Sequence, residues 1–459
     1  MDTHTRLLSM EHIMQKLRMG LWTVVAIPTA LWLLANTGVF QPLTFMALRG
    51  DMVQYTGVLA MTFMSIAMVL ATRPRWPERW FGGLDKMYRL HKWLGIGALG
   101  LGITHWLWSQ GPKWAIGWGL MARPDRGVRP VPDGVIEQAL RSLRGAAEGV
   151  GEWAFYAAVL LIVLALVKRF PYRAVFKTHL VLAVVYLVFV FHAVVLLKFD
   201  DWLTPLGIFM AVSLALGTWS ACLVLLRRVA SDRKAKGTIR DLRYYEGVHV
   251  LEATIDVPEG WQGHEAGQFA FLTSDTSEGA HPFTIASAWS PDERRLTFLV
   301  KELGDHTNRL KDRLRIGQEV MVEGPYGRFT FDDDQPKQIW VGGGIGITPF
   351  VARMQHMARQ NEKPWQGIDL FHTTTDLDET ALARLRADAA AAGVRLHVLV
   401  DSRDGLLNAD RIRAMVPNWR EASIWFCGPA GFGQALQRDF RDSCSDTSPK
   451  FHQELFAMR

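Results

Sequence analysis

The chain divides into a strongly apolar first part and a second part of mixed polarity. Residues 19–227 contain long apolar runs, whereas residues 236–459 alternate short apolar runs with polar turns. The long runs lie at residues 21–38, 53–71, 90–108, 155–167, 180–197 and 203–226. Most approach the ~20 residues that an α-helix needs to cross a bilayer core. The pattern predicts six transmembrane helices, or five if the short fourth run does not cross.

Basic residues indicate the orientation of this helical domain, which we place at residues 20–228. Lys and Arg cluster between the second and third runs, between the fourth and fifth, and after the sixth. Because basic loops favour the cytoplasmic side, both termini are expected there. Residues 109–152 conflict with this, since they place six Lys and Arg on the predicted outer side. Residues 1–19 predict an amphipathic helix on the inner face. The basic inner segments explain the net charge of +6, so we expect no nucleic-acid partner.

Four histidines occupy matching places in two of the apolar helices. His91 and His105 are fourteen residues apart, and His179 and His192 are thirteen apart. Each pair therefore spans about 20 Å along its helix. A histidine in lipid is costly unless it is paired or ligates a metal. Two bis-histidine haems, His91–His179 inside and His105–His192 outside, would satisfy all four. The alternative is four unrelated histidines facing the bundle interior.

The thirteen-residue spacing poses a geometric problem. Fourteen residues return to nearly the same helix face, but thirteen turn about 220°. The second histidine helix is therefore distorted, or it presents its two ligands at different azimuths.

The remaining chain predicts two soluble domains. Residues 236–334 contain short strands with period-two alternation, which is typical of a small antiparallel barrel. Residues 335–459 change to apolar strands, glycine-rich turns and helices, the pattern of an α/β nucleotide-binding domain. One such turn opens a helix and predicts a pyrophosphate site at the helix N-terminus. Its candidate residues are Gly343, Gly344, Gly346, Thr348 and Pro349.

One segment of the barrel resembles a known flavin motif. It runs from His281 through Pro282, Phe283 and Thr284 to Ser287. This segment is similar to that of the ferredoxin-NADP reductase superfamily, in the form found in ferric reductases and NADPH oxidases. The resemblance implies that the Thr284 hydroxyl approaches the flavin N5, where it is a catalytic residue, and that His281 and Ser287 help to hold the flavin. Taken alone, the segment is equally an edge strand broken by proline.

A second flavin segment resembles the same family. Gly304 and Thr307 match positions that receive the FAD pyrophosphate at a helix N-terminus. The family often has Trp before that threonine, and this chain has His306. The resemblance implies FAD as the flavin, bound without a covalent link.

Two further segments resemble the family's hydride-transfer site. Cys427, Gly428 and Pro429 match a loop that borders the nicotinamide C4 and the flavin N5. Cys427 is then a catalytic-site residue that shapes the site; alternatively it is a small buried residue at a strand end. Phe456 resembles the terminal aromatic that covers the flavin face, although this chain continues beyond it.

Nucleotide preference depends on a short segment after a predicted strand. Ser402 and Arg403 resemble the pair that binds the 2′-phosphate of NADPH, and a guanidinium suits phosphate. Arg403 is alternatively an exposed loop arginine. Asp401 argues for NADH, because a carboxylate favours a free ribose hydroxyl. We expect both nucleotides to be used, with NADPH ahead.

The resemblance extends over nearly the whole chain, to the ferric reductase-like and NADPH oxidase-like flavocytochromes. It implies a multi-pass protein of the bacterial inner membrane that moves electrons from cytoplasmic NAD(P)H through FAD and two b-type haems to an outer acceptor. Oxygen, giving superoxide, is our first expectation. The alternatives are a ferric chelate, or a periplasmic partner protein or quinone. Besides these and the lipid bilayer, no obligatory protein partner is expected.

Overall fold

The computed structural model describes residues 10–38, 44–122, 134–167, 172–276, 278–333, 335–361, 367–443 and 449–454. The chain forms two compact units. A helical unit comprises Gln15–Phe81 and Lys86–Ala230, and the second unit comprises mainly the residues from Ser231 onward.

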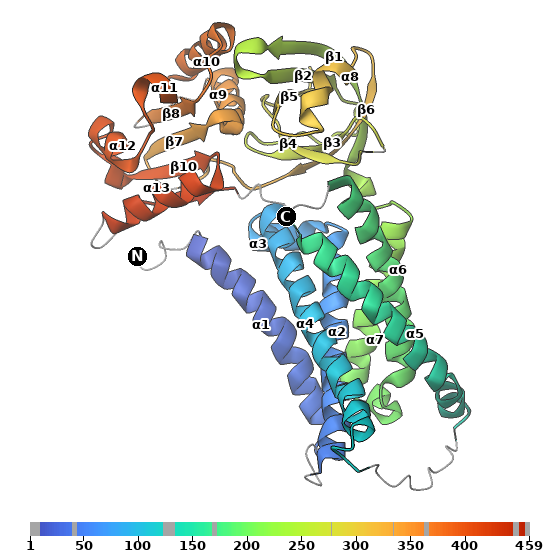
Figure 1. The fold of residues 1–459 in the computed structure, drawn as a ribbon. Helices are drawn as coiled ribbons and strands as arrows, with labels where there is room; N and C mark the ends of the chain where they lie inside the picture. Colours follow the sequence, from blue (N-terminus) through green and yellow to red (C-terminus); the bar gives the residue numbers. More distant parts are fainter. Residues whose placement is uncertain are drawn as a thin grey trace. The chain divides into compact units, whose positions relative to one another are not determined.

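In its described residues, the helical unit contains six long helices and one short one (Figure 1). These are α1 (Met10–Ala35), α2 (Phe45–Ala71), α3 (Arg75–Phe81), α4 (Leu84–Gly117), α5 (Val135–Leu166), α6 (Tyr172–Leu196) and α7 (Pro205–Leu225). Among the described residues, five helices are long and apolar enough to cross a membrane: all of the long ones except α4. α4 has the length, but its histidines, glycines and charged residues lower its mean hydropathy.

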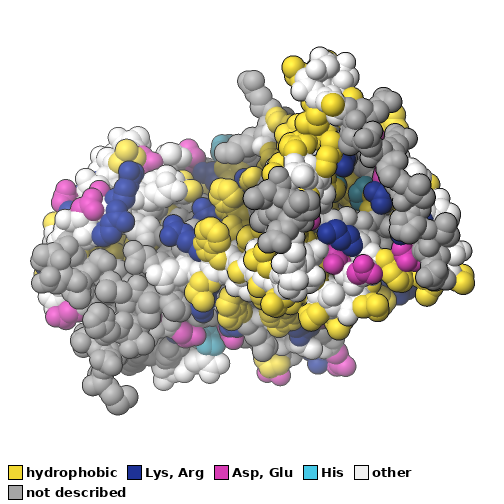
Figure 2. Space-filling model, turned by 90° about the horizontal axis from the view of Figure 1, so that it is seen from below, with side chains coloured by type: hydrophobic (Ala, Val, Ile, Leu, Met, Phe, Trp, Pro, Cys, Tyr) yellow, Lys and Arg dark blue, Asp and Glu magenta, His cyan; other side chains and the backbone are white. Residues whose placement is uncertain are grey.

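The surface of the helical unit agrees with a lipid environment. Large apolar side chains are exposed along its helices, among them Trp22, Trp153 and Trp219, which are 69%, 77% and 66% exposed. Figure 2 shows hydrophobic side chains gathered over this part of the molecule. Exposed apolar area on this scale is unusual for a soluble domain. The chain is a multi-pass membrane protein.

Two helices differ from the sequence prediction. We expected a short fourth helix at residues 155–167, but α5 begins twenty residues earlier, at Val135. Its first half is polar and therefore escapes a hydropathy pattern, and ion pairs between Arg141 and Glu137 and between Arg144 and Glu148 support it. α1 runs without a break from Met10 through the predicted boundary at residue 19; residues 1–9 lie outside the described residues.

The second unit begins with an antiparallel sheet. Its strands are β1 (Lys234–Tyr245), β2 (Val250–Asp256), β3 (Phe269–Thr273), β4 (His281–Thr284), β5 (Arg295–Lys301) and β6 (Glu319–Tyr326), in the order β4-β3-β6-β1-β2-β5. A bridge between Ile285 and Phe298 joins the two outer strands, so the sheet closes into a barrel. Both residues are completely buried in the barrel core. The predicted barrel is confirmed.

A parallel sheet follows, in the order β11-β10-β7-β8-β9. Its strands are β7 (Lys337–Gly343), β8 (Ile368–Thr374), β9 (Arg395–Val400), β10 (Ala422–Cys427) and β11 (Phe451–Gln453). α9 (Thr348–Gln360) and α10 (Glu379–Ala392) pack on one face, and α12 (Ala409–Met415) and α13 (Ala430–Asp442) pack on the other. The strand order reverses between β7 and β10, and ligands of such sheets bind at the carboxyl ends of the strands beside the reversal.

Candidate functional site

The helical unit brings its four histidines together as two pairs. The ring centres of His91 on α4 and His179 on α6 are 5.9 Å apart, and those of His105 and His192 are 6.2 Å apart. Two imidazoles that share a metal ion, each through a metal–nitrogen bond of about 2 Å, place their ring centres roughly 6 Å apart. Both separations therefore suit a bis-histidine iron, and the pairing is the one that the sequence predicts.

Hydrogen bonds orient three of these rings. Nδ1 of His91 lies 2.9 Å from the Ala67 carbonyl oxygen, and Nδ1 of His105 lies 3.0 Å from that of Val53. Nδ1 of His192 lies 2.8 Å from the carbonyl oxygen of Ala147. A carbonyl oxygen accepts only from a protonated nitrogen, so Nε2 of each ring keeps its lone pair. Metal-binding histidines usually have this second contact.

Glycine on a neighbouring helix makes room for the outer pair. A Cβ atom added at Gly151 of α5 would lie 2.1 Å from Nδ1 of His192. One added at Gly57 of α2 would lie 3.3 Å from the ring of His105. α6 is unbroken from Tyr172 to Leu196, which favours different azimuths for its two histidines over a distorted helix. The His192 side chain is accordingly seated against α5.

The first flavin segment forms β4. Its four residues, His281 to Thr284, are all half-buried, and Thr284 pairs with Phe269 of β3. The ring of His281 stacks on that of His306, with centres 3.8 Å apart and planes within 10°. His306 stands where the related proteins often have tryptophan, and its ring stacks on the ring of His281. Burial, together with the nearby His306, lowers the pKa of His281 to about 4, so His281 is neutral at pH 7.

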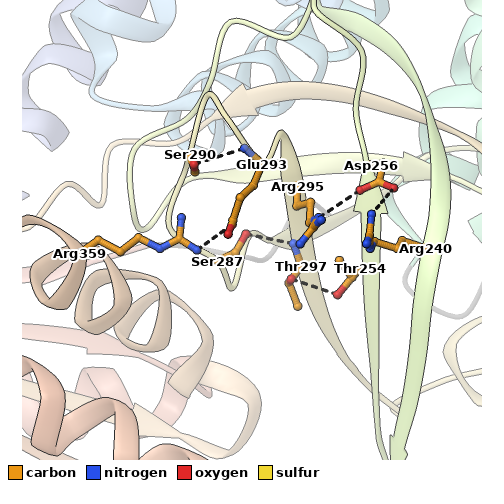
Figure 3. A network of polar contacts seen from close by, with 9 residues as sticks. All are labelled: Arg240, Thr254, Asp256, Ser287, Ser290, Glu293, Arg295, Thr297 and Arg359. Atoms are coloured by element: carbon orange, nitrogen blue, oxygen red, sulfur yellow. Dashed lines mark hydrogen bonds and ion pairs between the residues drawn. The ribbon is translucent and has the colours of Figure 1, made fainter.

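Ser287 takes part in the barrel's own hydrogen bonding (Figure 3). Its hydroxyl oxygen accepts the Thr297 backbone N–H at 3.0 Å, and its side chain is almost buried. Nε2 of His264 lies 2.8 Å from the Ser287 carbonyl oxygen. Near this strand, Arg359 of α9 donates to Glu293 of the barrel at 3.0 Å. Ser287 thus stabilises the segment that follows the flavin motif, and its contact with a flavin stays a prediction.

The second flavin segment is a tight turn. The Thr307 hydroxyl oxygen accepts the backbone N–H groups of Leu303 and Gly304, at 2.9 and 3.1 Å. Only a 3-10 turn (Thr307–Arg309) and the four-residue α8 (Leu310–Arg313) follow, so the helix predicted here is short. Its dipole is correspondingly small. A Cβ atom added at Gly304 would meet nothing within 4 Å, which leaves space beside this turn.

The glycine-rich turn and the cysteine loop, which are far apart in the sequence, lie in contact. β7 and β10 are parallel neighbours that pair Gly342 with Cys427. A Cβ atom added at Gly346 would lie 2.1 Å from the Cys427 carbonyl oxygen, so only glycine fits there. A Cβ atom at Gly343 would lie 3.0 Å from Pro429. Thr348 and Pro349 open α9, as predicted from the sequence.

Gly344 borders open space, whereas the Cys427 side chain is buried. Gly344 has a φ of +56°, which glycine adopts easily, and its Cα faces open space. Cys427 is 4% exposed, and burial raises the pKa of its thiol, so Cys427 is neutral and no nucleophile at pH 7. Its place beside the hydride-transfer position stays a prediction. Phe456, the predicted stacking aromatic, lies outside the described residues.

Ser402 and Arg403 lie at the carboxyl end of β9, in the short helix α11 (Asp401–Asp404). Both are exposed. The Arg403 guanidinium donates to both carboxylate oxygens of Asp404, at 3.1 and 2.9 Å. A phosphate at this position would therefore compete with Asp404 for Arg403.

Lys301 and His372 were not among the residues predicted from the sequence, and they line one cavity of ≈ 140 Å³ with Gly344. Lys301 comes from the barrel and pairs with Asp376 of the parallel-sheet domain at 3.3 Å. Nδ1 of His372 lies 3.2 Å from the Gly342 carbonyl oxygen, and burial lowers the pKa of His372 to about 4. No short motif marks either residue; they meet because β5 and β8 both pack against the turn at Gly344–Ile347.

Two protein families match separate parts of the chain. Residues 56–190 match the ferric reductase like transmembrane component, and residues 236–330 match an FAD-binding domain. The chain joins a ferric reductase-like transmembrane component to an FAD-binding domain. The first match contains His91, His105 and His179 and ends two residues before His192.

Individual relatives cover different parts of the chain. An NADPH oxidoreductase of Mycobacterium tuberculosis is 32% identical over 45% of this chain and 56% of its own length. Respiratory burst oxidase homolog protein B of Solanum tuberosum is 26% identical over 63% of this chain and 43% of its own. The chain thus spans about half the length of the curated relatives it matches. Among solved structures, a cytochrome P450 reductase of Amycolatopsis is 25% identical, with a TM-score of 0.42 over 49% of this chain and 70% of that one.

Proposed function

We propose that this protein is an NAD(P)H oxidoreductase of the ferric reductase and NADPH oxidase type, which moves electrons across the membrane to an acceptor on the outer side. The observation that carries the proposal is the pair of histidine couples, with ring centres 5.9 and 6.2 Å apart on α4 and α6. The proposal includes α4 as a sixth membrane-crossing helix, because both couples need it.

The histidines fit two b-type haems. His91 and His179 would hold one group and His105 and His192 the other, with the carbonyls of Ala67, Val53 and Ala147 fixing three of the rings. A haem iron supplies reversible one-electron transfer, and two histidine ligands favour this over oxygen binding at the metal. The protein's own contribution is to place four neutral imidazoles at two fixed levels.

The soluble unit would bind FAD and the nicotinamide nucleotide. β4 would hold the flavin with Thr284 toward its N5, and the turn at Gly304–Thr307 would accept its phosphates. The nucleotide would cross the carboxyl ends of β10, β7, β8 and β9, with its pyrophosphate near Gly344 and the ammonium group of Lys301. The buried Cys427 would keep water from the hydride-transfer position.

Oxygen is the acceptor we propose, with superoxide as the product, because the respiratory burst oxidase homolog matches over 63% of this chain. The basic segment at residues 109–152 does not favour an anionic chelate in its described part. There Lys113, Arg141 and Arg144 are balanced by Glu137, Glu148 and Glu152, and both arginines are ion-paired.

The test uses the purified full chain in detergent. We expect two b-type haems per chain in a pyridine haemochrome assay, and NADPH-driven reduction of cytochrome c that superoxide dismutase suppresses. In His192→Ala, one haem and the reduction of cytochrome c should be lost while NADPH still reduces the flavin. A haem-free wild-type protein would refute the proposal. Reduction that is insensitive to dismutase would refute oxygen and favour a chelate, a partner protein or a quinone.

A further inference from the structure

A second arginine faces the same cavity as Arg403. The cavity, of ≈ 340 Å³, lies between α10 and the edge strand β9. Its apolar wall includes Leu382, Leu396 and Val398, and its charged residues are Arg386, Arg403 and Glu379. Arg386 and Glu379 come from α10, whereas Arg403 comes from α11. Two separate helices therefore contribute guanidinium groups to one cavity.

The cavity lies at the distance from Cys427 that a dinucleotide spans. β10, β7, β8 and β9 are successive neighbours, and three steps of about 4.8 Å give roughly 14 Å between the ends of β10 and β9. A nicotinamide beside Cys427 therefore places the adenosine end of an extended nucleotide near β9. The cavity volume is within the range of small-molecule sites, about 300–1,000 Å³.

The guanidinium groups of Arg403 and Arg386 differ in their hydrogen-bond partners within the protein. Arg403 donates to Asp404 through Nε and Nη2, and Asp404 also accepts the Val400 backbone N–H. Arg386 makes no hydrogen bond or ion pair with any described residue and is exposed. A phosphate would displace no protein partner from Arg386. Glu379 lies close enough to Arg403 to interact with it electrostatically, and its carboxylate would repel a phosphate but accept from a ribose hydroxyl.

We propose that Arg386 and Glu379 determine nucleotide choice at this cavity: Arg386 binds the adenosine 2′-phosphate of NADPH, and Glu379 favours the free 2′-hydroxyl of NADH. The inference rests on the proposed use of NAD(P)H. The opposed charges account for the use of both nucleotides, which the pair Asp401 and Arg403 suggests from the sequence alone. No sequence motif joins the two arginines, because Arg386 lies 17 positions before Arg403 and on a different helix.

The test compares two probes on the full chain in detergent, by calorimetry: adenosine 2′,5′-bisphosphate and adenosine 5′-monophosphate. Arg386→Ala should weaken binding of the bisphosphate about five-fold, the scale of an exposed charge-assisted contact, with little effect on the monophosphate. Glu379→Gln should tighten the bisphosphate. Arg438→Ala is the matched control, because Arg438 bonds among the described residues only within its own helix, to the Gln434 carbonyl. The ratio of KM for NADPH to KM for NADH, measured by flavin reduction, should change in the same directions.

The outcomes separate the two proposals. Equal effects of Arg386→Ala on both probes, or an unchanged ratio of the two KM values, would overturn the assignment of Arg386. An unchanged or weaker affinity for the bisphosphate in Glu379→Gln would overturn that of Glu379. If neither nucleotide reduces the flavin, the proposed function fails, and the calorimetric comparison still decides whether this cavity recognises the 2′-phosphate.

Discussion

Replacing Gly151 by alanine tests the outer histidine pair without touching either histidine. The new Cβ atom would lie 2.1 Å from Nδ1 and 2.7 Å from Cε1 of His192. Non-bonded heavy atoms settle at about 3.5 Å, so the ring must retreat by more than about 1 Å. Metal–ligand distances tolerate roughly 0.2 Å, several times less than this displacement. The bond from His192 to the Ala147 carbonyl, 2.8 Å long, would be lost as well.

We therefore expect Gly151→Ala to lose the outer haem and keep the inner one. A pyridine haemochrome assay, normalised to protein, should fall from two haems to one. FAD content and flavin reduction by NADPH should stay at the wild-type level, since they depend on the other unit. Alanine favours a helix over glycine by about 1 kcal/mol, so weakening of α5 itself is not an explanation for the loss.

The matched control is Gly149→Ala on the same helix. A Cβ atom at Gly149 would meet nothing within 4 Å, so this variant should keep both haems. Two haems in Gly151→Ala would refute the seating of His192 against α5. Equal losses in the two variants would show that the effect belongs to α5 in general and not to His192.

Three further predictions concern the soluble unit. Burial opposes ionisation of Asp369, but hydrogen bonds from Arg395 and His397 hold its pKa far below the ordinary value. The stabilisation is therefore complete above about pH 5 and is lost only in strong acid, as the pH falls through the native pKa. Arg395→Ala should accordingly lower the free energy of unfolding by about 1–3 kcal/mol at pH 7 and by nearly as much at about pH 4, measured by denaturant-induced loss of the flavin; a loss that had disappeared by about pH 4 would contradict this. Because burial raises the pKa of the Cys427 thiol, iodoacetamide at pH 8 should leave Cys427 unmodified in the native protein, and rapid labelling seen by mass spectrometry would argue against its buried position. Thr284→Val should slow flavin reduction by NADPH in stopped-flow measurements more than it weakens FAD binding, whereas loss of FAD alone would assign Thr284 to binding.

Local patterns in the sequence predicted all or part of each long helix, the barrel and the parallel-sheet domain, and several contacts between them. Apolar runs marked all six long helices, of which five in the described residues are long and apolar enough to cross a membrane, and the histidine spacing predicted which rings would meet. Period-two alternation predicted the barrel, and the glycine-rich turn predicted the start of α9. Each of these patterns either repeats with the period of a helix or strand or marks a chain reversal. It therefore depends only on residues that are close in the sequence.

The tertiary structure decided what depends on neighbours far along the chain. The polar first half of α5 was invisible to hydropathy, yet it supplies the carbonyl of Ala147, and Gly151 at the middle of the same helix supplies the space that His192 occupies. Lys301 reaches the glycine-rich turn only because the barrel packs against the parallel sheet. Arg386 meets Arg403 only because α10 covers the edge strand β9. A single lysine, arginine or glycine carries no periodic signal, so its role is set by the packing of whole elements and not by the residues beside it.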